Sequence, residues 1–300
     1  MRILTAWFLR KRWEKLREQV ESLAQAEEYD RAEVLAGKAL EIAEKAFGPD
    51  SLEVAKSLRN LAGIYYDQED KHAQAAPLYE RELAILEKAL GPEHPELSLD
   101  QYNLATVYWG RGRLEEAEAL YKRSLAILEK DLGPENPNLT CGLFDLGRFY
   151  QACGKYRQAE QLYERVIAIS GKAYGPENLT VTACLYWIAM IHEAEGQFEQ
   201  AEQLLKRVLT IEEKTHGPED PGIGLSNALG NLAALYTTHG CYAQAEALYK
   251  RDLANHEKAY GSDHADASKA RERLAKLYRA TGREEDAEEI DRAGAKQRSR

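Results

Sequence analysis

Residues 97–134, LSLDQYNLATVYWGRGRLEEAEALYKRSLAILEKDLGP, contain two amphipathic helical patterns separated by a glycine-containing turn. In the first pattern Leu104, Ala105 and Tyr108 recur at i, i+1 and i+4, so they lie on one side of a helix. In the second, Ala117 is small enough to let two helices approach closely. Neither helix can bury its apolar side alone. The unit is therefore expected to be stable only when it stacks on similar units.

The same pattern recurs along the chain at a nearly constant period. A Gly-Pro dipeptide, or Gly-Ser in the last copy, begins at Gly48, Gly91, Gly133, Gly175, Gly217 and Gly261. The intervals between these glycines (48 to 91, 91 to 133 and onward) are 42 to 44 residues. Each glycine follows a helical pattern, where a residue with positive φ ends a helix most easily. This period predicts an all-α fold, a right-handed α-solenoid of about seven helix-turn-helix pairs.

The expected domain organisation follows from these marks. A basic and aromatic segment covers residues 1–13, a single array covers 14–297, and residues 298–300 form a tail. The repeats are expected at about 14–49, 53–92, 97–134, 139–176, 181–218 and 225–262, with 266–297 as a polar cap. Polar terminal repeats are what a stacked array needs to stop its own growth.

Charge and cysteine content narrow the classes of function. A formal net charge of −10 argues against general nucleic-acid binding, which needs a basic surface to neutralise phosphates. The apolar run at residues 3–9 is too short to span a membrane, and no cleavage site follows it. The four cysteines form no C-x-x-C pair and are expected to be small buried residues in a reducing compartment. The expected location is therefore the cytoplasm.

Motifs for catalysis or metal binding are missing from the sequence. No G-x-x-x-x-G-K-[ST], H-E-x-x-H or G-x-S-x-G pattern occurs. The seven histidines are scattered, and His94 and His192 have no second His or Cys at metal-ligand spacing. We expect a chain that is not an enzyme and that needs no cofactor and no metal.

Pairs of opposite charge stand four residues apart on the second helices, as in Glu118 and Lys122 or Glu202 and Lys206. Such pairs contribute only about 0.2–0.5 kcal/mol each. They indicate a solvated surface and no function.

The turn glycine, the L-A-x-x-Y set and the helix-turn-helix period together resemble the tetratricopeptide repeat. The longer form, with N-L-A-x-x-Y, A-E-x-L-Y-x-R-x-L and E-K-x-L-G-P-E-H-P, is similar to the repeats of kinesin light chains. The resemblance covers about residues 14–297. It implies that the first helices of successive repeats line a concave groove that holds an extended or helical peptide.

The resemblance also implies which residues line this groove. Asn60, Asn103 and Asn231 precede Leu-Ala, and a carboxamide can donate to and accept from a peptide backbone at once. Alternatively, each asparagine bonds within the array. The expected stripe is Arg59, Asn60, Tyr66, Leu99, Tyr102, Asn103, Thr106, Trp109, Phe144, Asp145, Arg148, Tyr186, Trp187, Met190, Asn231 and Arg273.

Two features of this stripe allow more than one interpretation. Aromatic side chains in a groove are typical anchors for a partner, but rings such as Phe144 could instead fill the space between adjacent first helices. The basic residues Lys269, Arg273, Lys276 and Arg279 could meet an acidic ligand segment, or they could form a solvated cap.

The sequence thus predicts a non-catalytic protein–protein interaction scaffold that binds a peptide or protein segment in its groove. A monomer is expected, with no nucleic-acid partner and no membrane span. One alternative is a self-assembling module that associates through its ends or through residues 1–13. Another is a sensor fragment of a larger signalling protein.

Overall fold

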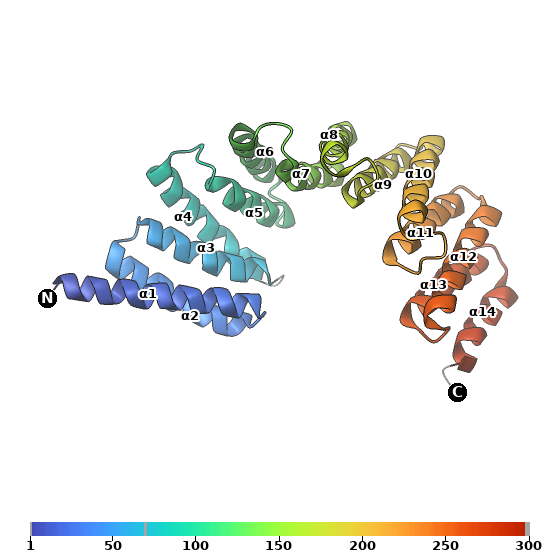
Figure 1. Cartoon of the computed structure of the whole chain (residues 1–300), viewed down its shortest axis with the longest axis horizontal. Helices are drawn as coiled ribbons and strands as arrows, with labels where there is room; N and C mark the ends of the chain where they lie inside the picture. The colour runs from blue at the N-terminus through green and yellow to red at the C-terminus, as the bar shows by residue number, and fades with distance from the viewer. Residues whose placement is uncertain (1, 69–70, 298–300) are drawn as a thin grey trace. The chain divides into compact units, whose positions relative to one another are not determined.

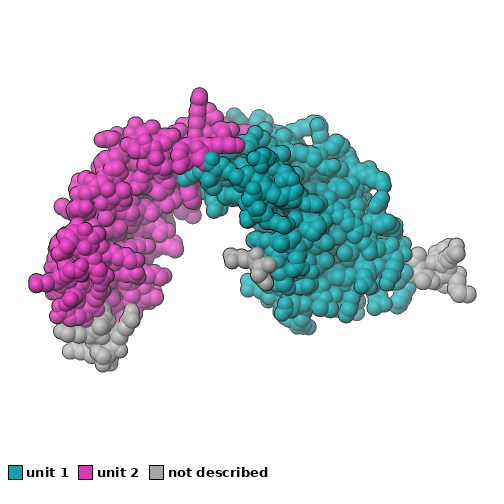
Figure 2. All heavy atoms as spheres, turned by 180° about the vertical axis from the view of Figure 1, so that it is seen from behind, with its two compact units in different colours: residues 1–153 teal, residues 154–300 magenta. Residues whose placement is uncertain are grey.

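The computed structural model describes residues 2–68 and 71–297, and within these ranges the chain forms helices and no strands. It divides into two compact units, Met1–Cys153 and Gly154–Arg300 (Figure 2). The helices of unit 1 are α1 (Arg2–Gln25), α2 (Tyr29–Phe47), α3 (Leu52–Tyr66), α4 (His72–Leu90), α5 (Leu97–Gly110), α6 (Leu114–Leu132) and α7 (Thr140–Ala152), with a short 3-10 helix η2 (Pro137–Leu139) before α7. The helices of unit 2 are α8 (Tyr156–Tyr174), α9 (Leu179–Ala194), α10 (Phe198–His216), α11 (Ile223–Thr238), α12 (Tyr242–Tyr260), α13 (Ala265–Ala280) and α14 (Glu284–Gln297).

The helices pack as consecutive pairs (Figure 1). In unit 1 the pairs are α1 with α2, α3 with α4 and α5 with α6; in unit 2 they are α9 with α10, α11 with α12 and α13 with α14. We call the odd-numbered helices first helices and the even-numbered ones second helices. The predicted all-α fold of about seven helix-turn-helix pairs is confirmed. Since α7 and α8 fall in different units, a single array running through residue 153 stays a prediction.

The predicted boundary after residue 13 lies inside α1, which runs without interruption from Arg2 to Gln25. Trp13 is buried, and its indole Nε1 donates a hydrogen bond of 2.8 Å to Ser57 Oγ on α3. Trp7 and Phe8, further toward the N-terminal end of α1, are exposed. Residues 298–300, the predicted tail, lie outside the described residues. Among the described residues, none of the helices has the length and apolar character needed to cross a membrane.

The residues that recur in the sequence form the core. Leu104, Ala105 and Tyr108 on α5 are buried, as are their counterparts Leu232, Ala233 and Tyr236 on α11. The alanines of the second helices, Ala117, Ala159, Ala201, Ala245 and Ala287, have no exposed surface. Their methyl groups fit where two helices meet closely, as the sequence predicted.

The glycines at the ends of helices have positive φ, as the sequence predicted. The glycines after the second helices have φ between 83° and 98°, and the turn glycines between paired helices have φ between 71° and 75°. The first two pairs have no turn glycine, and in the first pair Glu27 takes the same left-handed conformation with φ of 58°. That conformation costs a residue with a Cβ about 1 kcal/mol, because the side chain crowds the following carbonyl.

Hydrogen bonds between tyrosine and glutamate join successive pairs. The hydroxyl of Tyr150 on α7 donates to Glu118 Oε1 on α6 at 3.1 Å, and Tyr236 on α11 donates to Glu202 Oε1 on α10 at 2.6 Å. The other members are Tyr65 to Glu33, Tyr108 to Glu80 and Tyr278 to Glu246. The interpretation of Glu118 and Glu202 as parts of a merely solvated surface was therefore wrong. Each glutamate accepts from its lysine four residues on and also from the next pair of helices.

Charged residues near the Gly-Pro turns also link successive pairs. Lys130 at the end of α6 contacts Glu93 in the preceding turn at 2.5 Å, and Lys214 contacts Glu177 at 2.6 Å. Arg123 donates to the carbonyl oxygen of Pro92 at 2.9 Å. The motif E-K-x-L-G-P-E therefore describes contacts between neighbouring repeats.

Candidate binding groove

A cavity of about 300 Å³ opens in unit 1 between the first helices α5 and α7, above the second helix α6. Leu99 at its rim is 61% exposed, and Tyr102 and Tyr121 form its aromatic wall. The lining is Ser98, Leu99, Tyr102, Tyr121, Ser124, Leu125, Leu128, Asn138, Cys141 and Gly142. Most of this surface is apolar.

Unit 2 has a cavity of about 380 Å³ between the first helices α9 and α11, above α10. The predicted groove residues Tyr186 and Asn231 both line it. The lining is Leu179, Thr182, Ala183, Tyr186, Val208, Glu212, Gly224, Asn227, Ala228 and Asn231.

The two cavities are built from equivalent repeat positions. Tyr102 and Tyr186 both stand two residues before the Leu-Ala or Ile-Ala of their first helix. The floor differs, because Leu128 of α6 corresponds to Glu212 of α10. The repeat therefore leaves the same opening in both units and lines it with different chemistry.

Tyr102, which lines the cavity of unit 1, bonds to Asp145, another predicted groove residue. The Tyr102 hydroxyl donates to Asp145 Oδ2 at 2.5 Å, which joins α5 to α7. Burial, and then this hydrogen bond to a carboxylate, raise the pKa of Tyr102. Arg148 lies 3.6 Å from Asp145 Oδ1 on the same helix. The three side chains already have polar contacts within unit 1.

The predicted asparagine and threonine residues of the groove differ in their hydrogen-bond partners. Asn103 Nδ2 donates to the Tyr79 hydroxyl at 3.4 Å, and the Thr106 hydroxyl lies 2.9 Å from that of Tyr121. Asn60 Nδ2 is buried and has no hydrogen-bond partner among the described residues. The alternative that an asparagine bonds within the array therefore describes Asn103, whereas Asn231 lines a cavity.

Arg59 binds two buried carboxylates. Its Nε donates to Glu82 Oε1 at 2.7 Å, and its Nη2 donates to Asp100 Oδ2 at 2.5 Å. Both acidic side chains have no exposed surface. Burial, and then repulsion from Asp100, raise the pKa of Glu82 to about 9, and burial likewise raises the pKa of Asp100. Arg59 thus compensates buried charge between α3, α4 and α5.

The predicted aromatic anchors are half-buried. The ring centroid of Trp109 lies 5.7 Å from that of Phe149, and Tyr66 stacks on His72 at 5.5 Å. Tyr186 and Trp187 meet edge to face at 5.3 Å. Met190 packs against the core of unit 2, and Phe144 is also half-buried. These side chains expose only part of their surface.

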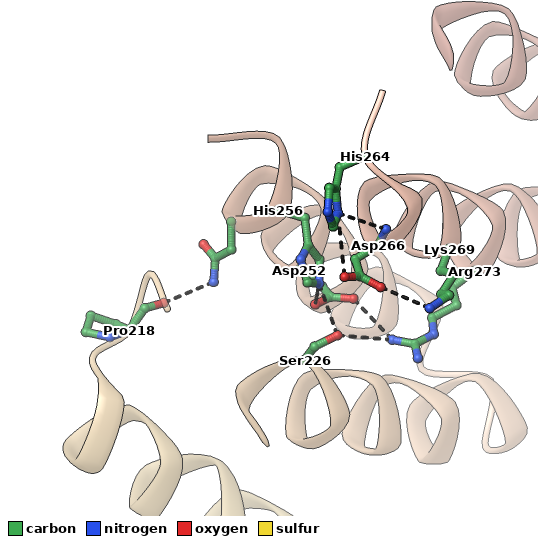
Figure 3. Close-up of polar contacts among 9 residues, drawn as sticks. Pro218, Ser226, Asp252, His256, His264, Asp266, Lys269 and Arg273 are labelled. Carbon is green, nitrogen blue, oxygen red and sulfur yellow. Dashed lines mark hydrogen bonds and ion pairs between the residues drawn. The ribbon is translucent and has the colours of Figure 1, made fainter. Parts of the chain in front are cut away.

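Figure 3 shows Arg273 in a polar cluster between α11, α12 and α13. Arg273 Nη1 lies 3.2 Å from Asp252 Oδ2 and 3.4 Å from Ser226 Oγ. His256 Nε2 lies 3.3 Å from Ser226 Oγ and 3.4 Å from Asp252 Oδ1. In a Ser-His-Asp triad the serine and the carboxylate contact different ring nitrogens. Here both contact Nε2, so the cluster lacks that geometry.

The basic residues predicted as a stripe on α13 each have an acidic neighbour. Lys269 contacts Asp266 at 3.0 Å, Lys276 contacts Glu272 at 2.7 Å, and Arg279 contacts Asp291. With Arg273 bound to Asp252, all four positive charges are compensated locally. Contact of these residues with an acidic ligand segment stays a prediction, as does the solvated cap.

Several cavity residues were not among those predicted from the sequence. Cys141 lines the cavity of unit 1, and Glu212 and Gly224 line that of unit 2, whereas Leu99 was expected in the groove. Of the four cysteines, only Cys184 is buried, and burial raises its pKa to about 12. Cys141 is exposed because its position faces the opening between first helices. The sequence did contain a signal for Glu212, because this position is acidic where the reference repeat has Leu128.

The tetratricopeptide repeat family model matches residues 15–88, 60–130, 138–214 and 224–294. The chain belongs to the tetratricopeptide repeat family. Tetratricopeptide repeats are typical of protein–protein interaction, and the family consists generally of non-catalytic scaffolds. A comparison with curated protein sequences found no significant match.

Solved structures resemble this tetratricopeptide chain over most of its length. The nearly identical TPR-like repeats of a kinesin light chain-like protein from Podosopora anserina are 31% identical, with 71% of this chain and 98% of that chain covered and a TM-score of 0.60. BtubC (BKLC) from P. vanneervenii is 24% identical, with 77% of this chain and 91% of that chain covered and a TM-score of 0.58. A STAND protein with a tetratricopeptide repeat sensor, PH0952 from Pyrococcus horikoshii, is 15% identical, with 94% and 41% covered and a TM-score of 0.65. The last two show the fold alone.

Proposed function

We propose that this tetratricopeptide protein is a non-catalytic scaffold that binds a peptide or protein segment along its first helices. The observation that carries the proposal is the recurrence of one cavity at equivalent repeat positions, between α5 and α7 and between α9 and α11. Half-buried aromatic walls with an exposed apolar rim suit a partner's side chains. The polar contacts of Tyr102 with Asp145 hold the first helices in place before a ligand binds.

The cavity of unit 1 is the one to test first, because Gly142 in its wall can be replaced without a backbone clash. A Cβ at Gly142 would meet no heavy atom within 4 Å. A leucine side chain there would instead occupy the cavity. Gly37 on α2 is a matched control, because it is also helical and its Cβ would also meet open space.

A photo-crosslinking residue at Leu99 should capture a discrete partner from native cell extract, and Gly142→Leu should abolish that product. Gly37→Leu should leave it unchanged. The same crosslinker at Val34, which is 57% exposed on a second helix, serves as the surface control. Capture of the same species at Val34, or no effect of Gly142→Leu, would show that the partner does not use this cavity.

A further inference from the structure

We propose that the cavity of unit 2 is a selective site for a lysine side chain of the bound segment, with Glu212 as its charge partner. The inference rests on the proposed function and specifies the chemistry of one anchor. The cavity of unit 1, with Leu128 at the equivalent position, would take an apolar side chain.

Glu212 is an acidic side chain placed where burial is costly. It is only 3% exposed, and its Oε2 is buried without a hydrogen-bond partner among the described residues. A buried carboxylate oxygen without a partner loses the hydration that it has in water. A ligand that donates to this oxygen would recover that loss.

The chain makes room for this carboxylate on the cavity side. Gly224 stands in the first turn of α11, and a Cβ there would overlap Oε2 of Glu212. Both residues line the cavity. The equivalent position in unit 1 is Asn138, opposite Leu128. An acidic floor and a glycine wall therefore occur together in unit 2.

Other groups in the cavity suit an ammonium group on an aliphatic stem. An ammonium has three N–H donors, and Thr182 and Asn231, which also line the cavity, supply further oxygen acceptors. The Thr182 hydroxyl already donates to Asn178 O at 3.2 Å, so its oxygen remains able to accept. Val208 and Ala183 provide apolar contact for the stem. One carboxylate oxygen without a hydrogen-bond partner suits an ammonium better than the two-pronged guanidinium of arginine.

His216 of the same helix could take the place of such a ligand, because its imidazole can carry a positive charge beside Glu212. Its Nδ1 lies 3.3 Å from Glu212 Oε2, but the contact is an ion pair only when the imidazole is protonated. The His216 side chain is 42% exposed and can turn away into water. With the imidazole turned away, the carboxylate can pair with an external cation.

The test titrates wild-type protein with N-acetyl-lysine-N-methylamide and follows the backbone amide of Gly224 by NMR. The norleucine analogue, which keeps the stem and lacks the charge, is titrated in parallel. Lysine amide should shift the Gly224 resonance saturably and bind roughly tenfold or more tightly than the norleucine amide, as a charge-assisted hydrogen bond implies. Equal responses to the two amides would overturn the proposal without any variant being needed.

Glu212→Gln is the variant of choice, because it keeps the shape of the side chain and removes the charge. It should reduce lysine-amide binding to the level of the norleucine amide. Glu199→Gln, an exposed position on the same helix, changes the net charge equally and should leave binding unchanged. If Glu199→Gln reduced binding as much as Glu212→Gln does, the change in net charge would explain the loss, and the proposed site would be rejected. The Gly142→Leu experiment tests partner binding at the cavity of unit 1, whereas the lysine-amide titration tests the cavity of unit 2. The proposed function and the lysine site can therefore fail independently.

Discussion

Arg59, Glu82 and Asp100 place two buried carboxylates beside one guanidinium. One positive charge cannot compensate both acids, so burial and mutual repulsion raise the pKa of Glu82 to about 9 from an ordinary 4.5. A carboxyl whose pKa is higher in the folded state stabilises the fold while it is protonated. That contribution is fully present below the unfolded pKa and is lost as the pH rises toward the folded value.

We therefore expect Glu82→Gln to flatten the pH dependence of stability. In the wild type the free energy of unfolding should fall between pH 5 and pH 9 (roughly the two pKa values of Glu82), and the variant should lose most of that slope. Urea unfolding at several pH values measures this directly. Glu115→Gln, at the exposed start of α6, is the control. Parallel curves for wild type and Glu82→Gln would mean that Glu82 does not hold the proton.

The sequence predicted the role of residues that repeat and missed the partners of those that do not. Leu104, Ala105 and Tyr108 recur at helical spacing, so their burial followed from the pattern alone. Arg59 lies in the groove register, yet its partner Glu82 stands 23 residues away on another helix. Spacing within one helix says which side a residue faces. It does not say which side chain of the next helix meets it.

Pairs of helices are joined by the tyrosine of each first helix and a glutamate of the preceding second helix. Tyr236 and Glu202 form such a bond at 2.6 Å. At the equivalent place on α9, His192 Nε2 lies 3.5 Å from Glu160, a contact that is ionic only when the histidine is protonated. The L-A-x-x-Y motif predicted a buried ring. It did not reveal the hydroxyl's acceptor, because Glu202 also matched a simple i, i+4 pair with Lys206.

We expect Tyr236→Phe to destabilise unit 2 by about 1 kcal/mol, the usual contribution of one hydrogen bond, because the ring stays packed and only the donor is removed. Chemical denaturation should show the change as a lower midpoint at unchanged slope. Tyr174→Phe is the matched control, since Tyr174 is mostly exposed. A loss of equal size in Tyr174→Phe would assign the effect to something other than the Glu202 contact.

Throughout the molecule, each helix packs chiefly on its sequence neighbours within the same unit. The contacts within unit 1 join α1 to α2, α2 to α3 and onward, with additional contacts between successive first helices such as α3 and α5. Stability in such an array is close to a sum of repeat and nearest-neighbour contributions. The periodicity of the glycines predicted this architecture. It could not predict the division after Cys153, because the fourth copy keeps the same motif residues as the others.

A local packing defect should therefore remain local. Ala117 has no exposed surface, so Ala117→Leu forces a larger side chain between close helices and should destabilise by about 1–3 kcal/mol. Hydrogen exchange should accelerate in α5 and α6, while amides in α12 and α13 keep their wild-type rates. Ala126→Leu, at an exposed position of α6, adds the same atoms and should change neither region. Equal acceleration in α12 and α13 would show that the molecule opens as one cooperative unit and that nearest-neighbour contacts do not confine the defect.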